Sequence, residues 1–300
     1  MKKFFMFMLG MLMIINISGC RSQEDVEITF SSCTDGLEYK NIVAGTSTAA
    51  EYLSAFNVSL KGVSDQENIP SEYSNVERIG SPRKVNMEKI MSIDPDLFVG
   101  DIASPINVQE QIKKQGIKAL WLDNSSYENV LISIEKLGKV LNQKDRADKL
   151  IKEIKLSEEN ALKGIDDLKG RKVALLFGTG ESYMLATEKS YLGSLLSKLG
   201  VQNVASEVSK SSSSYVKFSL ESIVSQNPDY ILTLAHGHKE QAAKAFEEEF
   251  KKDLWQTTNA IKQGNVYALD DKIFPVTGNI RVAETTESLK WLLLKGETNK

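Results

Sequence analysis

Two segments of this 300-residue chain repeat one order of residue types 133 positions apart, and this repeat restricts the possible folds more than any other feature. Residues 87–99 and residues 220–232 each predict a short helix led by an acidic residue, a Pro-Asp turn and an apolar strand. Proline cannot continue a helix, so the Pro-Asp pair marks the boundary before the strand. The same elements in the same order predict two similar lobes, although one shared stretch of this common kind is also compatible with coincidence.

Elsewhere the chain alternates between strand-like and helical patterns, for example 41–44 followed by 46–56. This alternation is typical of βα units that build a mostly parallel sheet. Between the two repeats, residues 142–169 carry apolar side chains near helical spacing among Lys and Glu. They predict one long helix of about 40 Å at a rise of 1.5 Å per residue. The apolar spacing drifts away from a heptad, so a coiled coil is not favoured.

The predicted fold class is therefore α/β, with two similar αβ lobes and mostly parallel sheets. The N-terminal lobe covers residues 28–141, the C-terminal lobe covers residues 170–300, and the rigid helix 142–169 joins them. Ligands of such sheets bind outside the carboxyl ends of the strands, so we expect the ligand in the cleft between the lobes. A stiff link predicts small lobe movements rather than wide hinge closure.

Residues 1–19 predict a signal peptide that is not part of the fold. Two lysines precede an apolar run over 4–17, and the sequence Ile-Ser-Gly leads to Cys20. This arrangement is typical of a secretory signal, and it resembles the bacterial lipobox, which implies cleavage before Cys20 and a diacylglycerol on its thiol. The apolar run is shorter than the ~20 residues of a spanning helix, so an uncleaved anchor is the less favoured alternative. The polar residues 20–27 predict a flexible tether.

Composition excludes several classes of function. The formal charge of −3 becomes −5 without the two signal lysines, and there is no basic patch of the kind that binds nucleic acid. With Cys20 acylated, Cys33 has no partner for an intramolecular disulfide. The sequence has no Gly-x-Ser-x-Gly elbow, P-loop or dinucleotide-binding glycine pattern. We therefore expect a protein that is not an enzyme, with an extracytoplasmic body.

The chain has only two histidines, His236 and His238, and both follow the apolar run 230–234. Imidazole is the commonest metal ligand among side chains, and it binds as the neutral base. We therefore predict that His236 coordinates a metal at a strand end, with a solvated surface histidine as the alternative. Residues two apart in an extended segment face the same side, so His238 is the natural substitute. A zinc or manganese site needs about three histidines and a carboxylate, which this pair cannot supply.

The lipobox, the two lobes and the linking helix together resemble the substrate-binding proteins of ABC importers for haem, siderophores and corrinoids. Residues 178–193, 234–237 and 246–255 are similar to the haem-binding lipoproteins of the IsdE type. The resemblance implies a monomer, lipid-anchored on the outer face of the cytoplasmic membrane, that captures haem for an ABC permease dimer and its ATPase. An upstream haem-donor protein is a further implied partner.

In that family a histidine of the second lobe and a methionine of the first lobe hold the haem iron. His236 falls on the histidine position, whereas Arg83 stands where the methionine is expected. Three interpretations remain open. Met87 supplies the second ligand, although the repeat pairs it with an apolar core position; or Met184 lines the ligand; or Arg83 binds a haem propionate while His236 alone holds the iron. We prefer the third, because guanidinium groups suit carboxylates and a five-coordinate iron with one imidazole is ordinary chemistry.

Loops at strand ends supply the remaining predicted site residues. Gly80 and Ser81 precede Arg83, and Tyr183 follows the second-lobe strand, where it stacks on the macrocycle, ligates iron as phenolate or forms plain wall. Glu88 and Glu221 occupy the same position in the two repeats. The resemblance implies that they dock with arginines of the permease, while a helix N-terminus also favours an acid for its dipole alone.

A ferric siderophore or corrinoid is the main alternative ligand. Siderophore binders need no imidazole and commonly use arginines against anionic chelates. Arg83, Arg281 and the missing methionine are compatible with that alternative.

Overall fold

The first lobe is built around a five-stranded parallel sheet. In the computed structural model, which describes residues 38–179, 182–236 and 239–296, its strand order is β3-β2-β1-β6-β7. The strands are β1 (Ile42–Ala44), β2 (Gly62–Val63), β3 (Glu77–Arg78), β6 (Leu97–Asp101) and β7 (Ala119–Leu122). Every neighbouring pair is parallel, as predicted. Cys20, Cys33 and His238 lie outside the described residues, as do the predicted signal peptide and tether.

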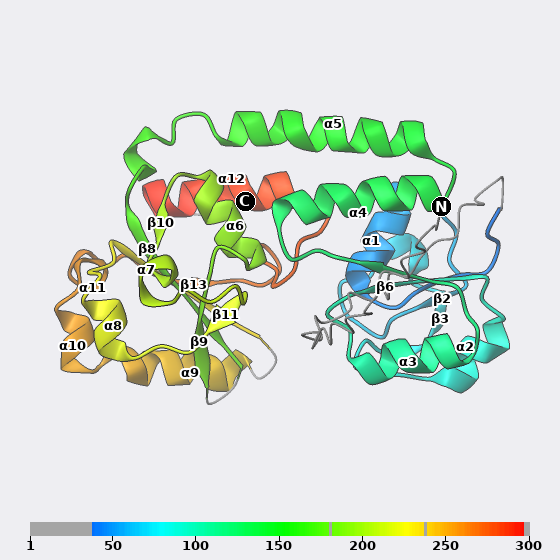
Figure 1. Cartoon of the computed structure of the whole chain (residues 1–300), viewed down its shortest axis with the longest axis horizontal. Helices are drawn as coiled ribbons and strands as arrows, with labels where there is room; N and C mark the ends of the chain where they lie inside the picture. The colour runs from blue at the N-terminus through cyan, green and yellow to red at the C-terminus, as the bar shows by residue number, and fades with distance from the viewer. Residues whose placement is uncertain (1–37, 180–181, 237–238, 297–300) are drawn as a thin grey trace, which may run out of the picture. The chain divides into compact units, whose positions relative to one another are not determined.

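Helices cover both faces of this sheet. They are α1 (Ser47–Ala55), α2 (Met87–Ile93), α3 (Ile106–Lys114) and α4 (Tyr127–Val140). Successive strand residues point to opposite faces. In β1, Ile42 and Ala44 join the apolar core that includes α1 and α4, whereas Val43 joins the core beneath α2 and α3. Figure 1 shows α2 and α3 on the face opposite α1 and α4.

The second lobe contains a mixed sheet with the order β11-β9-β8-β12-β13, and β10 pairs with β8. Its strands are β8 (Lys172–Gly178), β9 (Tyr183–Ala186), β10 (Gln202–Asn203), β11 (Tyr215–Val216), β12 (Tyr230–Ala235) and β13 (Val266–Leu269). β8, β10, β12 and β13 run parallel, and β9 and β11 form an antiparallel edge. The surrounding helices are α6 (Tyr191–Lys198), α7 (Ala205–Val208), α8 (Leu220–Val224), α9 (Lys239–Phe250), α10 (Asp253–Gln256), α11 (Asn259–Gln263) and α12 (Val282–Lys295).

The repeat predicted from the sequence is confirmed in atomic detail. Its two copies form α2–β6 and α8–β12, and each strand lies inside its sheet. The aspartate of each Pro-Asp turn accepts a hydrogen bond from a backbone amide at the start of the first strand of its lobe. Asp96 binds the amide of Asn41 at 3.0 Å, and Asp229 binds the amide of Lys172 at 2.9 Å. The two lobes therefore share this helix–turn–strand unit, although the second sheet adds an antiparallel edge.

The linking helix is shorter than predicted. Helix α5 spans Lys144–Ala161, 18 residues and about 27 Å at 1.5 Å per residue, rather than residues 142–169. Asn142 and Gly164 adopt left-handed backbone conformations on either side of α5, with φ of 53° and 70°. Such conformations are incompatible with a continuing α-helix. The apolar residues after Ala161 still pack against the core, but from a turn and a 3₁₀ segment, Asp166–Leu168.

Helix α5 nevertheless contacts both lobes. It packs against α4 and also against α12, as Figure 1 shows. Gly138 of α4 makes the first crossing close, because a Cβ there would lie 2.4 Å from the Cβ of Ala147. None of the described helices combines the length and the apolar character needed to span a bilayer.

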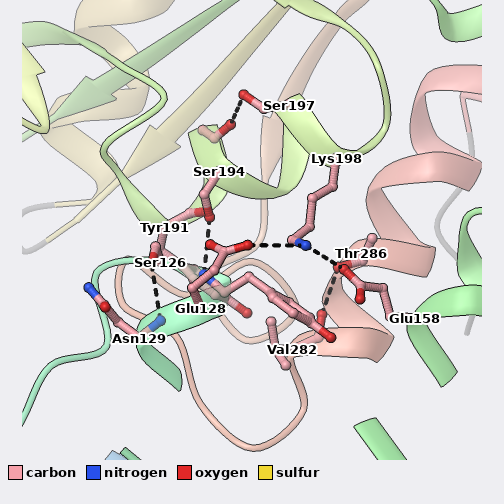
Figure 2. Close-up of polar contacts among 12 residues, drawn as sticks. Ser126, Glu128, Asn129, Glu158, Tyr191, Ser194, Ser197, Lys198, Val282 and Thr286 are labelled. Carbon is pink, nitrogen blue, oxygen red and sulfur yellow. Dashed lines mark hydrogen bonds and ion pairs between the residues drawn. The ribbon is translucent and has the colours of Figure 1, made fainter. Parts of the chain in front are cut away.

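Polar contacts attach the second-lobe helix α6 to α4 and α5, as Figure 2 shows. The Lys198 ammonium lies 3.1 Å from a carboxylate oxygen of Glu128 and 3.0 Å from one of Glu158. It also lies 4.0 Å from the centroid of the Tyr127 ring. The Tyr127 amide donates to the hydroxyl of Ser194 at 3.2 Å. A single lysine of the second lobe thus joins the starting turn of α4 to α5.

Candidate functional site

His236 follows the last residue of β12 at the carboxyl edge of the second sheet. Its amide donates to the carbonyl of Gly178 at 2.9 Å, which extends the pairing of β12 with β8 by one residue. Its ring stacks against Phe177, with centroids 6.2 Å apart and planes inclined by 26°. Phe177 is buried and itself contacts Tyr215, with centroids 4.6 Å apart. The half-buried imidazole thus lies beside Phe177, which in turn packs against Tyr215.

The imidazole is held in the form that coordinates metals. Burial lowers the pKa of His236 below its usual value, and the positive charge of Arg83 lowers it further. Lys239 also lowers this pKa, whereas the carboxylate of Asp271 opposes the shift. Burial disfavours the charged imidazolium, and nearby cations repel it. His236 is therefore neutral at pH 7 and available as a ligand.

Arg83 sits at the tip of a β-hairpin in the first lobe. Strands β4 (Gly80–Ser81) and β5 (Lys84–Val85) are antiparallel, and residues 82–83 form the two-residue turn. Gly80 has φ of 89°, and a Cβ there would lie 2.7 Å from the carbonyl oxygen of Lys84. The Ser81 hydroxyl accepts from the amide of Lys84 at 3.2 Å. Gly80 and Ser81 thus shape a hairpin that presents an exposed Arg83, whose charge acts on His236 of the other lobe.

The two methionines have apolar surroundings. Met87 begins α2 and packs against the first-lobe core beside Ile90, which agrees with its apolar position in the repeat. Met184 on β9 pairs in register with Phe177 and packs against the main core. It therefore lies on the His236 side of the sheet, with Phe177 on the strand between them.

Tyr183 flanks the same strand end as His236 but belongs to the opposite face of the sheet. It pairs in register with Gly178, packs against Phe246 at a centroid distance of 5.6 Å and donates its hydroxyl to Glu249. Burial and this carboxylate raise the pKa of Tyr183. The structure therefore keeps the phenol protonated and does not bring it together with His236 on one face.

Sequence reasoning missed Glu249, the buried carboxylate behind Tyr183. It accepts hydrogen bonds from the indole of Trp255 at 3.1 Å and the ammonium of Lys252 at 2.6 Å, as well as from Tyr183. Burial opposes ionisation, but these donors together hold the pKa of Glu249 below its usual value. The available signal was the helical spacing of Ala242, Phe246 and Glu249, which share the buried face of α9.

Arg281 is engaged at another point between the lobes. Its guanidinium lies 3.4 Å from Glu51 of α1, and both residues line a hollow of about 320 Å³ together with Lys272. Burial raises the pKa of Glu51 although the charge of Arg281 opposes this. Arg281 is thus paired with a carboxylate of the first lobe.

Glu88 and Glu221 occupy equivalent places in the two lobes. Each lies exposed in the first turn of its helix, after a capping residue. Asn86 accepts from the amide of Lys89 at 3.1 Å, and Ser219 accepts from the amide of Ser222 at 3.2 Å. Neither glutamate forms an ion pair with another described residue. Both are therefore available for contact with a partner.

Within residues 38–179, 182–236 and 239–296, no three His, Cys, Asp or Glu side chains converge on a point that could hold a metal ion. This part of the chain instead offers the imidazole of His236 in the second lobe, the guanidinium of Arg83 in the first lobe, and loops at the edge of each sheet. These features define a ligand-binding protein of two αβ lobes.

The chain belongs to the periplasmic binding protein family, which matches residues 42–273. This is a family of binding proteins for ABC importers and not of enzymes, so the expectation of a non-enzymatic protein is confirmed. Membership also implies an ABC permease and its ATPase as partners.

Two relatives carry the resemblance further. The chain is 29% identical over 287 residues to the high-affinity heme uptake system protein IsdE of Staphylococcus aureus, which covers 94% of each chain. The structure of S. aureus IsdE complexed with heme matches with a TM-score of 0.78 and 28% identity, covering 86% of this chain and 100% of that one. An ABC transporter substrate-binding protein from Listeria monocytogenes gives the same TM-score and identity and covers 86% and 99%. The predicted resemblance to the IsdE type is thus confirmed.

More distant structures share the fold alone. The triscatecholate siderophore binding protein FeuA of Bacillus subtilis matches at 19% identity with a TM-score of 0.70. The vitamin B12 binding protein BtuF of Vibrio cholerae matches at 17% identity with a TM-score of 0.67. The fold by itself is therefore compatible with several classes of cargo.

Proposed function

We propose that this protein is an extracytoplasmic haem-binding lipoprotein that captures haem and delivers it to an ABC permease for iron acquisition. The observation that carries the proposal is the position of His236 at the carboxyl end of β12, where its amide continues the sheet and its ring lies against Phe177. Burial and the charge of Arg83 also lower the pKa of this imidazole. The similarity to IsdE, a heme uptake protein, supports haem as the cargo.

Haem requires an iron ligand, apolar surroundings and cations for its two propionates. In this proposal His236 holds the iron, and Phe177 supports the imidazole from behind. Arg83 binds one propionate through its guanidinium fork, which matches a carboxylate. Met87 and Met184, partly buried, pack against the apolar cores, so in this proposal His236 is the one protein ligand and the iron is five-coordinate. That Tyr183 contacts the ligand at the edge of the site stays a prediction.

The membrane attachment is part of the same proposal. Cys20 would carry the lipid after removal of residues 1–19, and the body would act as a monomer on the outer face of the cytoplasmic membrane. It would receive haem from an upstream donor protein and pass it to the permease dimer. Glu88 and Glu221 would make the permease contacts, one from each lobe.

A ferric siderophore is the second candidate cargo. Arg83 stands where the haem-binding relatives are expected to have methionine, and an arginine suits an anionic chelate. Because siderophore binders share this fold, the cargo has to be tested directly.

The test compares ligands on the mature chain. Haemin, a ferric tricatecholate and cobalamin are titrated separately, and binding is followed by quenching of tryptophan fluorescence. We expect haemin to bind at least about tenfold more tightly than the other two, a difference of ~1.4 kcal/mol. Tighter binding of the ferric tricatecholate would replace haem by a siderophore as the cargo.

A further inference from the structure

A second cation lies beside His236, in its own lobe. Lys239 is the first residue of α9, three positions after His236. Its ammonium contacts both carboxylate oxygens of Asp271, at 2.7 Å and 2.6 Å. Asp271 lies between β13 and α12, so this ion pair ties the start of α9 to that loop. The ammonium is thereby held in one place.

The ion pair is open to a ligand on the lysine side. The side chain of Lys239 is 53% exposed, whereas that of Asp271 is only 22% exposed. An ammonium has three N–H donors, and two are enough to serve the two oxygens of Asp271. The remaining donor can serve a further acceptor. Asp271 thus orients the ammonium without using all its hydrogen-bonding capacity.

Lys239 is placed near His236 by the chain itself, because α9 begins with Lys239 three positions after His236. Its ion pair with Asp271 therefore follows the same strand end as the imidazole. The charge of Arg83, from the first-lobe hairpin, also lowers the pKa of His236. A ligand that reaches the imidazole therefore meets Lys239 in this lobe and Arg83 in the other. A dianion that presents two carboxylates to both lobes matches this arrangement.

We propose that Lys239 is a specificity-determining residue that binds the second carboxylate of the cargo, with Asp271 as the group that positions its ammonium. This inference rests on the proposed function, and it defines the cargo as a planar tetrapyrrole with two free carboxylates. Lysine acts on a carboxylate as a compact point charge, in contrast to the fork of Arg83. Each lobe then contributes one anchor.

The test compares haemin with its dimethyl ester, in which both carboxylates are blocked. Both ligands are titrated into the mature parent protein and the Lys239→Gln variant, with Lys244→Gln on the same helix as the matched control. Lys239→Gln should bind haemin about tenfold more weakly, because a charge-assisted hydrogen bond is lost, and should bind the diester as the parent does. The Soret position should not change, since the iron ligand is intact. Lys239→Arg should recover most of the affinity.

Two results would overturn the inference. One is an unchanged haemin affinity in Lys239→Gln; the other is an equal loss for haemin and its diester, which would show a role unrelated to carboxylates. Failure of the proposed function has a different signature, because the parent protein itself would then bind neither form of haem.

Discussion

At the scale of single residues, the protonation of His236 follows from its neighbours. Burial and the charge of Arg83 both lower its pKa, so the folded protein binds this proton more weakly than the unfolded chain does. The neutral form is therefore fully present above the ordinary histidine pKa of about 6.5. It is lost only as the pH falls through the lower value of the folded state. Iron coordination by this residue should weaken in the same acidic window.

This electrostatic contact across the lobes can be measured directly. The chain has only two histidines, so His238→Ala leaves a single imidazole signal for proton NMR titration. We expect His236 to titrate below its usual value in that background and at a higher pH when Arg83→Ala is added, because the repelling charge is gone. Lys113→Ala, remote in sequence and on α3, serves as the control. An unchanged His236 pKa in Arg83→Ala would show that the hairpin does not face the imidazole.

A residue's position can be predicted from sequence when it depends on neighbours along the chain, and not when it depends on contacts between distant segments. The position of His236 at a strand end follows from an apolar run that stops just before it. The Glu249 contact with Tyr183 joins residues 66 positions apart; helical spacing could have placed Glu249 on the buried face of α9, but it does not show which side chain meets it there. The Lys239–Asp271 pair is hidden for the same reason, since its partners are 32 positions apart.

At the scale of secondary-structure elements, α2 and α8 are equivalent helices that each expose one acid. A two-fold partner can meet both lobes with the same surface, because both lobes carry the same helix–turn–strand unit. The caps at Asn86 and Ser219 fix the first turn from which each glutamate projects. The acids are thus placed by local structure that does not depend on the ligand site.

Neutralising these acids should separate docking from binding. Glu88→Gln and Glu221→Gln should each reduce haem uptake in a reconstituted transporter several-fold, and the double variant should reduce it further. Haemin affinity should stay at the parental value in all three. Glu240→Gln, an exposed acid in the first turn of α9, is the control. A loss of haemin binding in either single variant would move that glutamate into the ligand site.

Element boundaries show where pattern reasoning fell short. The apolar spacing of residues 142–169 predicted one long helix, yet α5 ends at Ala161, shortly before Gly164 turns the backbone to the left-handed region. A 3₁₀ segment places Leu168 in the core just as a longer helix would have done. Hydrophobic spacing alone does not distinguish a continued α-helix from a turn followed by a 3₁₀ segment.

At the scale of the whole molecule, the lobes are joined by contacts that no local pattern predicts. Lys198 holds Glu128 and Glu158 in a half-buried cluster (Figure 2), and the amide of Gly278 donates to the carbonyl of Asn124 at 2.7 Å. Their partners are far apart in the sequence. The two-lobe plan was therefore predictable from the repeat, whereas the contacts that join the lobes were not.

Removing the charge of Lys198 should weaken the contact between the lobes and lower the stability of the protein. Lys198→Met leaves Glu158 largely buried without its partner, so we expect a loss of roughly 2 kcal/mol of unfolding free energy, between the values typical of exposed and buried pairs. Lys152→Met on the exposed side of α5 should change stability by less than about 0.5 kcal/mol. Urea denaturation measures both. Equal stability of Lys198→Met and the parent would mean that the ion pairs of Lys198 with Glu128 and Glu158 do not stabilise the contact between the lobes.

The central claim, that His236 holds the iron of a captured haem, is tested most directly by absorption spectra of haemin bound to the parent and to His236→Ala. We predict a strong Soret band with the signature of one axial imidazole in the parent, and loss of that signature in His236→Ala. An identical spectrum in the two proteins would contradict the claim and place the iron ligand elsewhere.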